Sequence, residues 1–266
     1  MTVEEVVLGR GAEQMRVALY PARDHRALGN GGVLLLAHGR GGAEASPHMV
    51  PIREAALRLG LAVVAPDLRF SDANESAGRG RDFRMGAHRD DMARVLDWIT
   101  SDQRPALLPE PGAGPLVIAG HSMGGYGALA LAVERAAHVD GILAVCPVVS
   151  GKAILEARAA MGQPALDALE AEVPGATADY AQHDLAPIAP QITQPVVFVV
   201  GELDGLARAV DVRAFGRLLP DRLSYVLLPH AHHCPSGENY ALALREQLAL
   251  LLRAILIETR TQPRDT

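Results

Sequence analysis

Short runs of consecutive apolar residues recur along the chain, separated by segments with a helical spacing of apolar positions. Strands that helices cover on both faces need such uninterrupted runs, because neither face meets water. Six runs of this kind occur: Val33–Ala37, Leu61–Ala65, Leu116–Ala119, Gly141–Val145, Pro195–Val200 and Leu223–Leu228. We expect them to form a parallel sheet, with Val3–Leu8 and Met15–Tyr20 as an antiparallel pair at its edge.

The segments between these runs have the pattern of amphipathic helices. In one of them Met92, Val95, Leu96 and Ile99 repeat at helical spacing. Helices are predicted at His48–Arg58, Gly86–Thr100, Gly124–Ala137 and Val210–Leu218. The apolar stretch Leu242–Ile257 contains charged residues, so we interpret it as a terminal helix packed on the sheet rather than a membrane span. Alternating strands and helices predict an α/β fold with a doubly wound, mostly parallel sheet flanked by helices.

One long segment, residues 148–191, interrupts this alternation. It contains no convincing strand. Helical patterns occur at Lys152–Met161 and Pro164–Glu172, and Pro174 and Gly175 end the second pattern. We predict a small helical cap inserted over the end of the sheet, with a longer surface crossover as the alternative. The expected organisation is one domain, residues 1–266, with the cap insertion at 148–191 within it.

Composition limits the classes of partner that we expect the protein to bind. The 266 residues are 49% hydrophobic, which is enough to bury a sizeable core. Their net charge of −6 argues against a nucleic-acid or anionic membrane surface. Cys146 and Cys234 lack the Cys-x-x-Cys spacing of zinc sites, so we expect two buried, reduced thiols. The first residues lack the pattern of a signal peptide, and a cytoplasmic monomer or homodimer is expected.

The sequence Gly120-His121-Ser122-Met123-Gly124 directly follows a predicted strand and precedes a helix of small residues. A strained turn between strand and helix exposes a serine above the sheet, and flanking glycines leave room for it. The helix N-terminus then directs free N–H groups toward the reacting centre. We predict Ser122 as a nucleophile; an ordinary strand-to-helix turn that happens to contain serine is the alternative.

With this motif in place, the chain resembles the α/β-hydrolase superfamily from about residue 33 to the terminal helix. It is most similar to the esterase, dienelactone-hydrolase-like and cutinase-like branches, and Gly-His-Ser-Met-Gly-Gly is similar to the cutinase motif. Dienelactone hydrolases use cysteine as nucleophile, and haloalkane dehalogenases and epoxide hydrolases use aspartate. Ser122 departs from both patterns. The resemblance implies the order serine, acid, histidine for the remaining catalytic residues.

Asp204 fits the acid, because Gly201-Glu202-Leu203-Asp204 resembles the acid turn of the family and follows a strand. Glu202 is the competing carboxylate, and a turn-capping role is the alternative for Asp204. The base should follow the next strand, where His230, His232 and His233 compete. The count from Pro229 in the resemblance favours His233, with His232 as the main competitor; a metal site at this cluster is not expected.

A tetrahedral intermediate also needs preorganised N–H donors. We assign these to the backbone of Met123, next to the nucleophile, and of Arg40, because His38-Gly39-Arg40-Gly41-Gly42 resembles the His-Gly oxyanion motif of the family. A plain glycine-rich turn is the alternative. The Arg40 side chain is expected to point outward or to meet an anionic substrate group, and His38 to bond the loop backbone.

The resemblance implies a serine hydrolase that acts on a small-molecule ester substrate, or on a thioester or amide, through an acyl-enzyme and without a cofactor. Ser122, His233 and Asp204 would form its triad. Perhydrolysis and acyl transfer would use the same residues. A non-catalytic binding protein on the hydrolase fold is the competing hypothesis, because a fold alone does not determine function.

Overall fold

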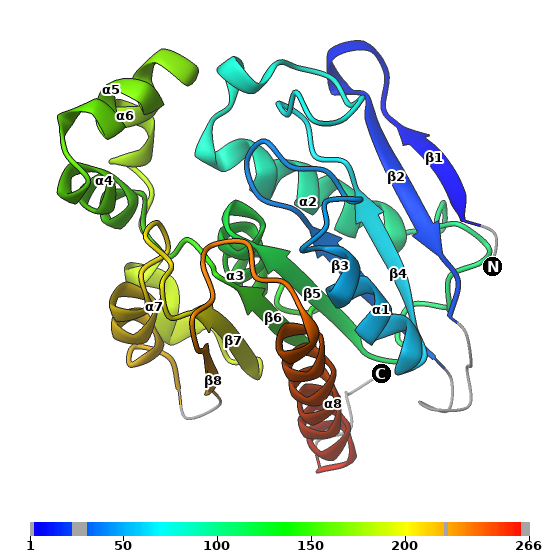
Figure 1. Cartoon of the computed structure of the whole chain (residues 1–266). Coiled ribbons are helices and arrows are strands. Elements are labelled where there is room, and N and C mark those ends of the chain that lie inside the picture. Colours follow the sequence, from blue (N-terminus) through cyan, green and yellow to red (C-terminus); the bar gives the residue numbers. More distant parts are fainter. Residues whose placement is uncertain (1–2, 23–30, 221–222, 262–266) are drawn as a thin grey trace.

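The computed structural model describes residues 3–22, 31–220 and 223–261. Within them the strands form a single sheet in the order β1-β2-β4-β3-β5-β6-β7-β8 (Figure 1). The strands are β1 (Glu4–Leu8), β2 (Met15–Tyr20), β3 (Gly32–Ala37), β4 (Leu61–Pro66), β5 (Leu116–His121), β6 (Gly141–Val145), β7 (Val196–Gly201) and β8 (Leu223–Leu228). Each predicted run therefore forms a strand.

The pairing of the strands is mostly parallel. β1 pairs with β2, and β2 with β4, in antiparallel register. All other neighbours run parallel, from β4 through β3 to β8. The residues of β3, β4 and β7 are buried throughout, which is why their sequences are apolar without alternation. The predicted α/β class with a mostly parallel sheet and an antiparallel edge pair is confirmed.

Helices cover both faces of the sheet (Figure 1). The helices α2 (Met85–Ile99), α3 (Met123–Glu134) and α7 (Ala209–Gly216) pack in one hydrophobic core, and α1 (Val50–Arg58) and α8 (Glu238–Thr261) in the other. The terminal helix packs on the sheet through Leu244, Leu248 and Leu252, which are buried. Within the described ranges, no helix combines the length and the apolar character that a membrane crossing requires.

A helical segment connects β6 to β7 and comprises α4 (Gly151–Ala160), α5 (Gln163–Glu172), α6 (Ala176–Tyr180) and a 3-10 helix at Ala186–Gln191. Figure 1 shows α4, α5 and α6 grouped at the upper left, outside the two helical layers. The two ends of the segment meet, because Ser150 and Asp184 form an isolated antiparallel bridge. Sequence reasoning did not anticipate α6, which has only five residues. A capping role for the segment stays a prediction.

Candidate active site

Ser122 occupies a sharp turn between β5 and α3. Its backbone angles, φ 55° and ψ −115°, are sparsely populated by residues with a side chain. The neighbouring glycines allow the turn, because a Cβ at Gly120 would overlap the backbone of Gly124, and one at Gly124 would overlap the carbonyl oxygen of Ala37. The sequence thus folds locally as the strand–turn–helix motif requires.

The structure brings Ser122 together with two residues from distant loops. Nε2 of His233 lies 2.9 Å from the Ser122 hydroxyl oxygen, and Nδ1 of His233 lies 2.8 Å from Oδ2 of Asp204. The Asp204 carboxylate is completely buried, and the His233 side chain is 21% exposed. Because a carboxylate only accepts, Nδ1 of His233 carries a proton and Nε2 is free to accept from the serine hydroxyl.

The turn after β7 fixes the orientation of Asp204. Its Oδ1 accepts hydrogen bonds from the backbone N–H groups of Leu206 (2.8 Å) and Ala207 (2.9 Å), so Oδ2 faces His233. Asp204 therefore caps the turn with one oxygen and orients the imidazole with the other. The competing carboxylate, Glu202, instead accepts from the backbone N–H of His230 (2.9 Å).

The competing histidine, His232, points elsewhere. Its side chain is exposed, and Nδ1 lies 3.2 Å from the carbonyl of Leu203. A further histidine, His121, holds the loop of His233 in place: its Nε2 donates to the backbone carbonyl of His233 at 2.7 Å. Sequence reasoning missed this role, although the position of His121 beside the nucleophile is a signal that could have indicated it.

The loop after β3 lies against the nucleophile. A Cβ at Gly39 would stand 2.8 Å from the Ser122 Cβ. His38, behind the loop, donates from Nδ1 to the Gly39 carbonyl (2.7 Å) and accepts at Nε2 from the Leu68 N–H (2.8 Å), which is the backbone bonding expected of it. Because the C=O and N–H of a trans peptide point in opposite directions, this bond turns the N–H of Arg40 away from His38.

Met123, the second predicted donor, is the first residue of α3. The N–H groups of a first helical turn have no acceptor within the helix. Arg40 and Met123 both line the cavity beside Ser122. The Arg40 side chain turns toward the helical segment between β6 and β7, where it forms an ion pair with Glu172 at 2.8 Å. The sequence led us to expect that this side chain points outward or meets an anionic substrate group. It did not indicate a partner within the chain.

A sequence profile of the alpha/beta hydrolase fold family matches residues 32–167, which contain β3, the turn at Ser122 and the first part of the helical segment. The match covers more than half of the chain. The chain belongs to the alpha/beta hydrolase fold family. No curated protein sequence matches it.

Solved structures of other alpha/beta hydrolases are similar over nearly the whole chain. GrgF from Penicillium sp. sh18 is 18% identical, with 96% of this chain and 100% of that chain covered and a TM-score of 0.74. Est1E from Butyrivibrio proteoclasticus, solved with ferulic acid bound, is 16% identical, with coverages of 90% and 96% and a TM-score of 0.71. A dienelactone hydrolase from Anabaena variabilis is 19% identical, with coverages of 95% and 97% and a TM-score of 0.66. At these identities the likeness concerns the fold.

A cavity of about 110 Å³ opens beside Ser122 in this hydrolase. Its lining comes from the turn at Ser122, the loops after β3, β7 and β8, and the helical segment. The lining residues are Arg40, Ser122, Met123, Val148, Ile154, Arg158, Tyr180, Leu206 and His233. Among the apolar residues in and directly after α4, Ile154 lines this cavity, Leu155 packs against the core and Met161 is 53% exposed.

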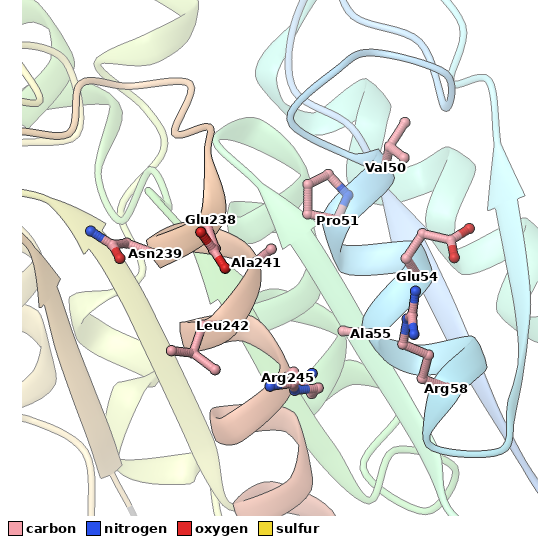
Figure 2. Close-up of a pocket in the computed structure, with 10 residues that line it drawn as sticks. All are labelled: Val50, Pro51, Glu54, Ala55, Arg58, Glu238, Asn239, Ala241, Leu242 and Arg245. Carbon is pink, nitrogen blue, oxygen red and sulfur yellow. The ribbon is translucent and has the colours of Figure 1, made fainter.

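A larger cavity, of about 620 Å³, lies between α1 and α8 and contains none of the predicted site residues. Figure 2 shows Glu54 and Arg58 on its α1 side and Leu242 and Arg245 on its α8 side. Its size exceeds that of the cavity at Ser122, but among the described residues its lining contains no serine, threonine, cysteine or histidine, and its acidic residues are Glu54 and Glu238. The hydrogen-bonded serine and histidine of this hydrolase border the smaller cavity.

The described residues contain one group of potential metal ligands. His48, His121 and Cys234 each place a ligand atom within 4.8 Å of the others. Nε2 of His121 already donates to a carbonyl, which leaves Nδ1 as its ligand atom. The absence of a metal site, expected from the sequence, stays a prediction.

The two cysteines differ from expectation in one respect. Cys146 is buried at the end of β6, as expected, but Cys234 is exposed. The expectation of two buried thiols is therefore wrong for Cys234, which lies in the loop after β8. Both cysteines are free. Burial raises the pKa of the Cys146 thiol well above its usual range, which makes this thiol a poor nucleophile.

His38, His88 and His121 are buried, and their burial sets a pH dependence of folding. Burial lowers the pKa of His38 to about 4 and holds the pKa values of His88 and His121 well below the usual range. Between pH 6.5 and about 4 the unfolded chain therefore binds protons that the folded chain does not. We expect the free energy of unfolding to decrease as the pH is lowered through this range, by roughly 1.4 kcal/mol per pH unit for each histidine.

Urea denaturation at a series of pH values between 7.5 and 5 measures this slope. The variant His88→Leu should lose about one third of it, since one of three similar contributions is removed. The matched control is His138→Gln, because His138 is exposed, and it should leave the slope unchanged. A stability that does not change between pH 6.5 and 5 would contradict the buried, neutral state of these histidines.

Proposed function

We propose that this member of the alpha/beta hydrolase fold family is a serine hydrolase that cleaves carboxylic esters through an acyl-enzyme. The observation that carries the proposal is the unbroken hydrogen-bonded chain from Asp204 through His233 to Ser122, with distances of 2.8 and 2.9 Å. A serine hydroxyl needs such a base, and the base needs an orienting acid, before it attacks at neutral pH.

In the first step, the Ser122 hydroxyl oxygen attacks the ester carbonyl carbon while Nε2 of His233 takes its proton. The backbone N–H groups of Arg40 and Met123 bind the oxygen that becomes negatively charged. The imidazolium that results carries its second proton at Nδ1, where the Asp204 carboxylate stabilises it. Nε2–H then protonates the departing alkoxide oxygen, and the acyl group stays on Ser122.

In the second step, water attacks the acyl carbonyl and His233 takes a proton from it. The tetrahedral intermediate collapses, the Ser122 oxygen leaves with the proton from Nε2, and the carboxylic acid is released. No step needs a cofactor. Thioesters and amides would react at the same atoms, and so would hydrogen peroxide or an alcohol in place of water. Whether water, hydrogen peroxide or an alcohol accepts the acyl group depends on the access of water to the cavity.

The helical segment between β6 and β7 acts as a cap in this proposal, since Ile154, Arg158 and Tyr180 from it border the cavity at Ser122. The cavity volume of about 110 Å³ is small beside the roughly 300–1,000 Å³ of pockets that hold drug-sized ligands. We therefore propose short acyl groups as substrates. We also propose the cytoplasmic location that the sequence leads us to expect.

A substrate panel tests this function: p-nitrophenyl esters from acetyl to palmitoyl, a thioester and an anilide. We expect kcat/KM to be highest for the short esters and to fall by roughly tenfold or more for palmitoyl, because the longer chain does not fit. Ser122→Ala is the control for background hydrolysis. If no ester, thioester or anilide is cleaved faster by the protein than by this control, the proposed function is wrong and a binding role is favoured.

A further inference from the structure

The helical segment contributes two polar side chains to the cavity at Ser122. Val148, Ile154 and Leu206 supply apolar surface, whereas Arg158 on α4 and Tyr180 at the end of α6 bring hydrogen-bond donors. Among the described residues, the lining contains no aspartate or glutamate. The cavity thus combines the nucleophile with donors that no carboxylate of the lining balances.

Tyr180 is the more deeply buried of these donors. Only 1% of its surface is exposed, and its hydroxyl has no hydrogen-bond partner within the described part of the chain. Burial raises its pKa to about 12, while the nearby guanidinium groups of Arg40 and Arg158 act in the opposite direction. The phenol is therefore a neutral donor. An unpaired buried hydroxyl is costly, and an acceptor from a ligand would remove this cost.

Arg158 supplies a positive charge beside it. One terminal nitrogen donates to the carbonyl of Ala165 at 3.2 Å, and the buried Nε has no partner among the described residues. Arg40 is different, because Glu172 neutralises it in an ion pair at 2.8 Å. No described carboxylate forms such a pair with Arg158. The cavity therefore has an uncompensated guanidinium next to an unpaired phenol, the donors that suit a carboxylate.

We propose that Arg158 and Tyr180 bind a carboxylate on the acyl part of the substrate, so that the enzyme acts on monoesters of short dicarboxylic acids. This inference rests on the proposed ester hydrolysis at Ser122 and assigns the substrate class of that site. The volume of about 110 Å³ corresponds to roughly four water-sized groups, which fits a linker of two methylene groups and the carboxylate. A carboxylate on the acyl part stays bound while the alcohol leaves. It therefore orients the ester in the first step and the acyl-enzyme in the second.

The test compares monoethyl succinate with its neutral isostere, in which an isopropyl group replaces the carboxylate. Ethanol release is measured for the protein and for Arg158→Met, Tyr180→Phe and the control Arg253→Met, which removes an exposed arginine on α8. We expect a preference for the charged ester. The ratio of the two kcat/KM values should fall roughly tenfold to a hundredfold in Arg158→Met and severalfold in Tyr180→Phe. It should not change in Arg253→Met.

A general loss of activity in a variant does not change the ratio of the two kcat/KM values, because both substrates react with the same nucleophile. Cleavage of the neutral isostere with equal or higher efficiency would overturn the carboxylate subsite and leave ester hydrolysis intact. An ester with the carboxylate on the alcohol side, O-acetylglycolate, is the third substrate. A preference for this ester over monoethyl succinate would overturn the assignment of the carboxylate to the acyl part.

A binding measurement separates this inference from the proposed function. Calorimetric titration of monoethyl succinate into Ser122→Ala reports the subsite without turnover. We expect binding that weakens roughly tenfold or more when Arg158→Met is added. Binding of this kind together with a failure of every substrate to react would contradict the proposed hydrolysis but support the subsite. Equal binding by the single and double variants would overturn the subsite.

Discussion

Replacing Ser122 by alanine is expected to lower kcat for short esters by about four to six orders of magnitude, because it removes the atom that attacks the carbonyl. The fold should not suffer, since the turn backbone and its glycines are unchanged. Activity is measured with p-nitrophenyl butyrate. The matched control is Ser101→Ala, in the loop after α2, which should retain full activity. Retention of more than a trace of activity by Ser122→Ala would contradict the assignment.

The same position gives a second, independent readout. At φ 55° and ψ −115° a residue with a side chain is strained, and glycine is not. Ser122→Gly should therefore be as inactive as Ser122→Ala but more stable to urea than that variant, by about 1–2 kcal/mol. Equal stability of the two variants would contradict the strain that this turn geometry implies.

Asp204→Asn should lower kcat by about four orders of magnitude with little change in stability. The reason is the environment of each carboxylate oxygen. The N–H groups of Leu206 and Ala207 hold Oδ1, so the asparagine will place its oxygen there and its NH₂ group toward Nδ1 of His233. The imidazole must then accept at Nδ1 and carry its proton at Nε2. In that tautomer it cannot take the proton of Ser122.

The matched control for Asp204→Asn is Glu202→Gln, in the same turn. Glu202 accepts from the backbone of His230 and does not contact His233, so activity should stay within a few-fold of the wild-type value. Steady-state rates with p-nitrophenyl butyrate measure both variants. A larger loss in Glu202→Gln than in Asp204→Asn would show that the orienting carboxylate is misassigned.

Much of the fold was predictable from the sequence, because buried parallel strands leave a local signature. The runs that became β3, β4 and β7 are apolar throughout, and a strand in contact with helices on both faces tolerates little else. The turn at Ser122 was predictable for a similar reason, since two glycines must flank a serine in this backbone conformation. These features depend on residues that are neighbours in the chain.

Other features depend on distant contacts and could not be predicted. His232 and His233 are adjacent and chemically identical, and only the path of the loop directs the second toward Asp204 and the first toward solvent. The pairing of Arg40 with Glu172, 132 positions later, has no local pattern. The same holds for Tyr180 and Ser122, which line one cavity because of how the helical segment between β6 and β7 folds.

In the proposed mechanism, Ser122 is a nucleophile that His233 activates. Reaction with a fluorophosphonate, followed by mass spectrometry of the intact protein and its peptides, tests this role. We expect a single adduct, on the peptide that contains Ser122, and labelling that is strongly slowed in His233→Ala but not in His232→Ala. An unlabelled protein, an adduct at another residue, or equal labelling of the two histidine variants would contradict it.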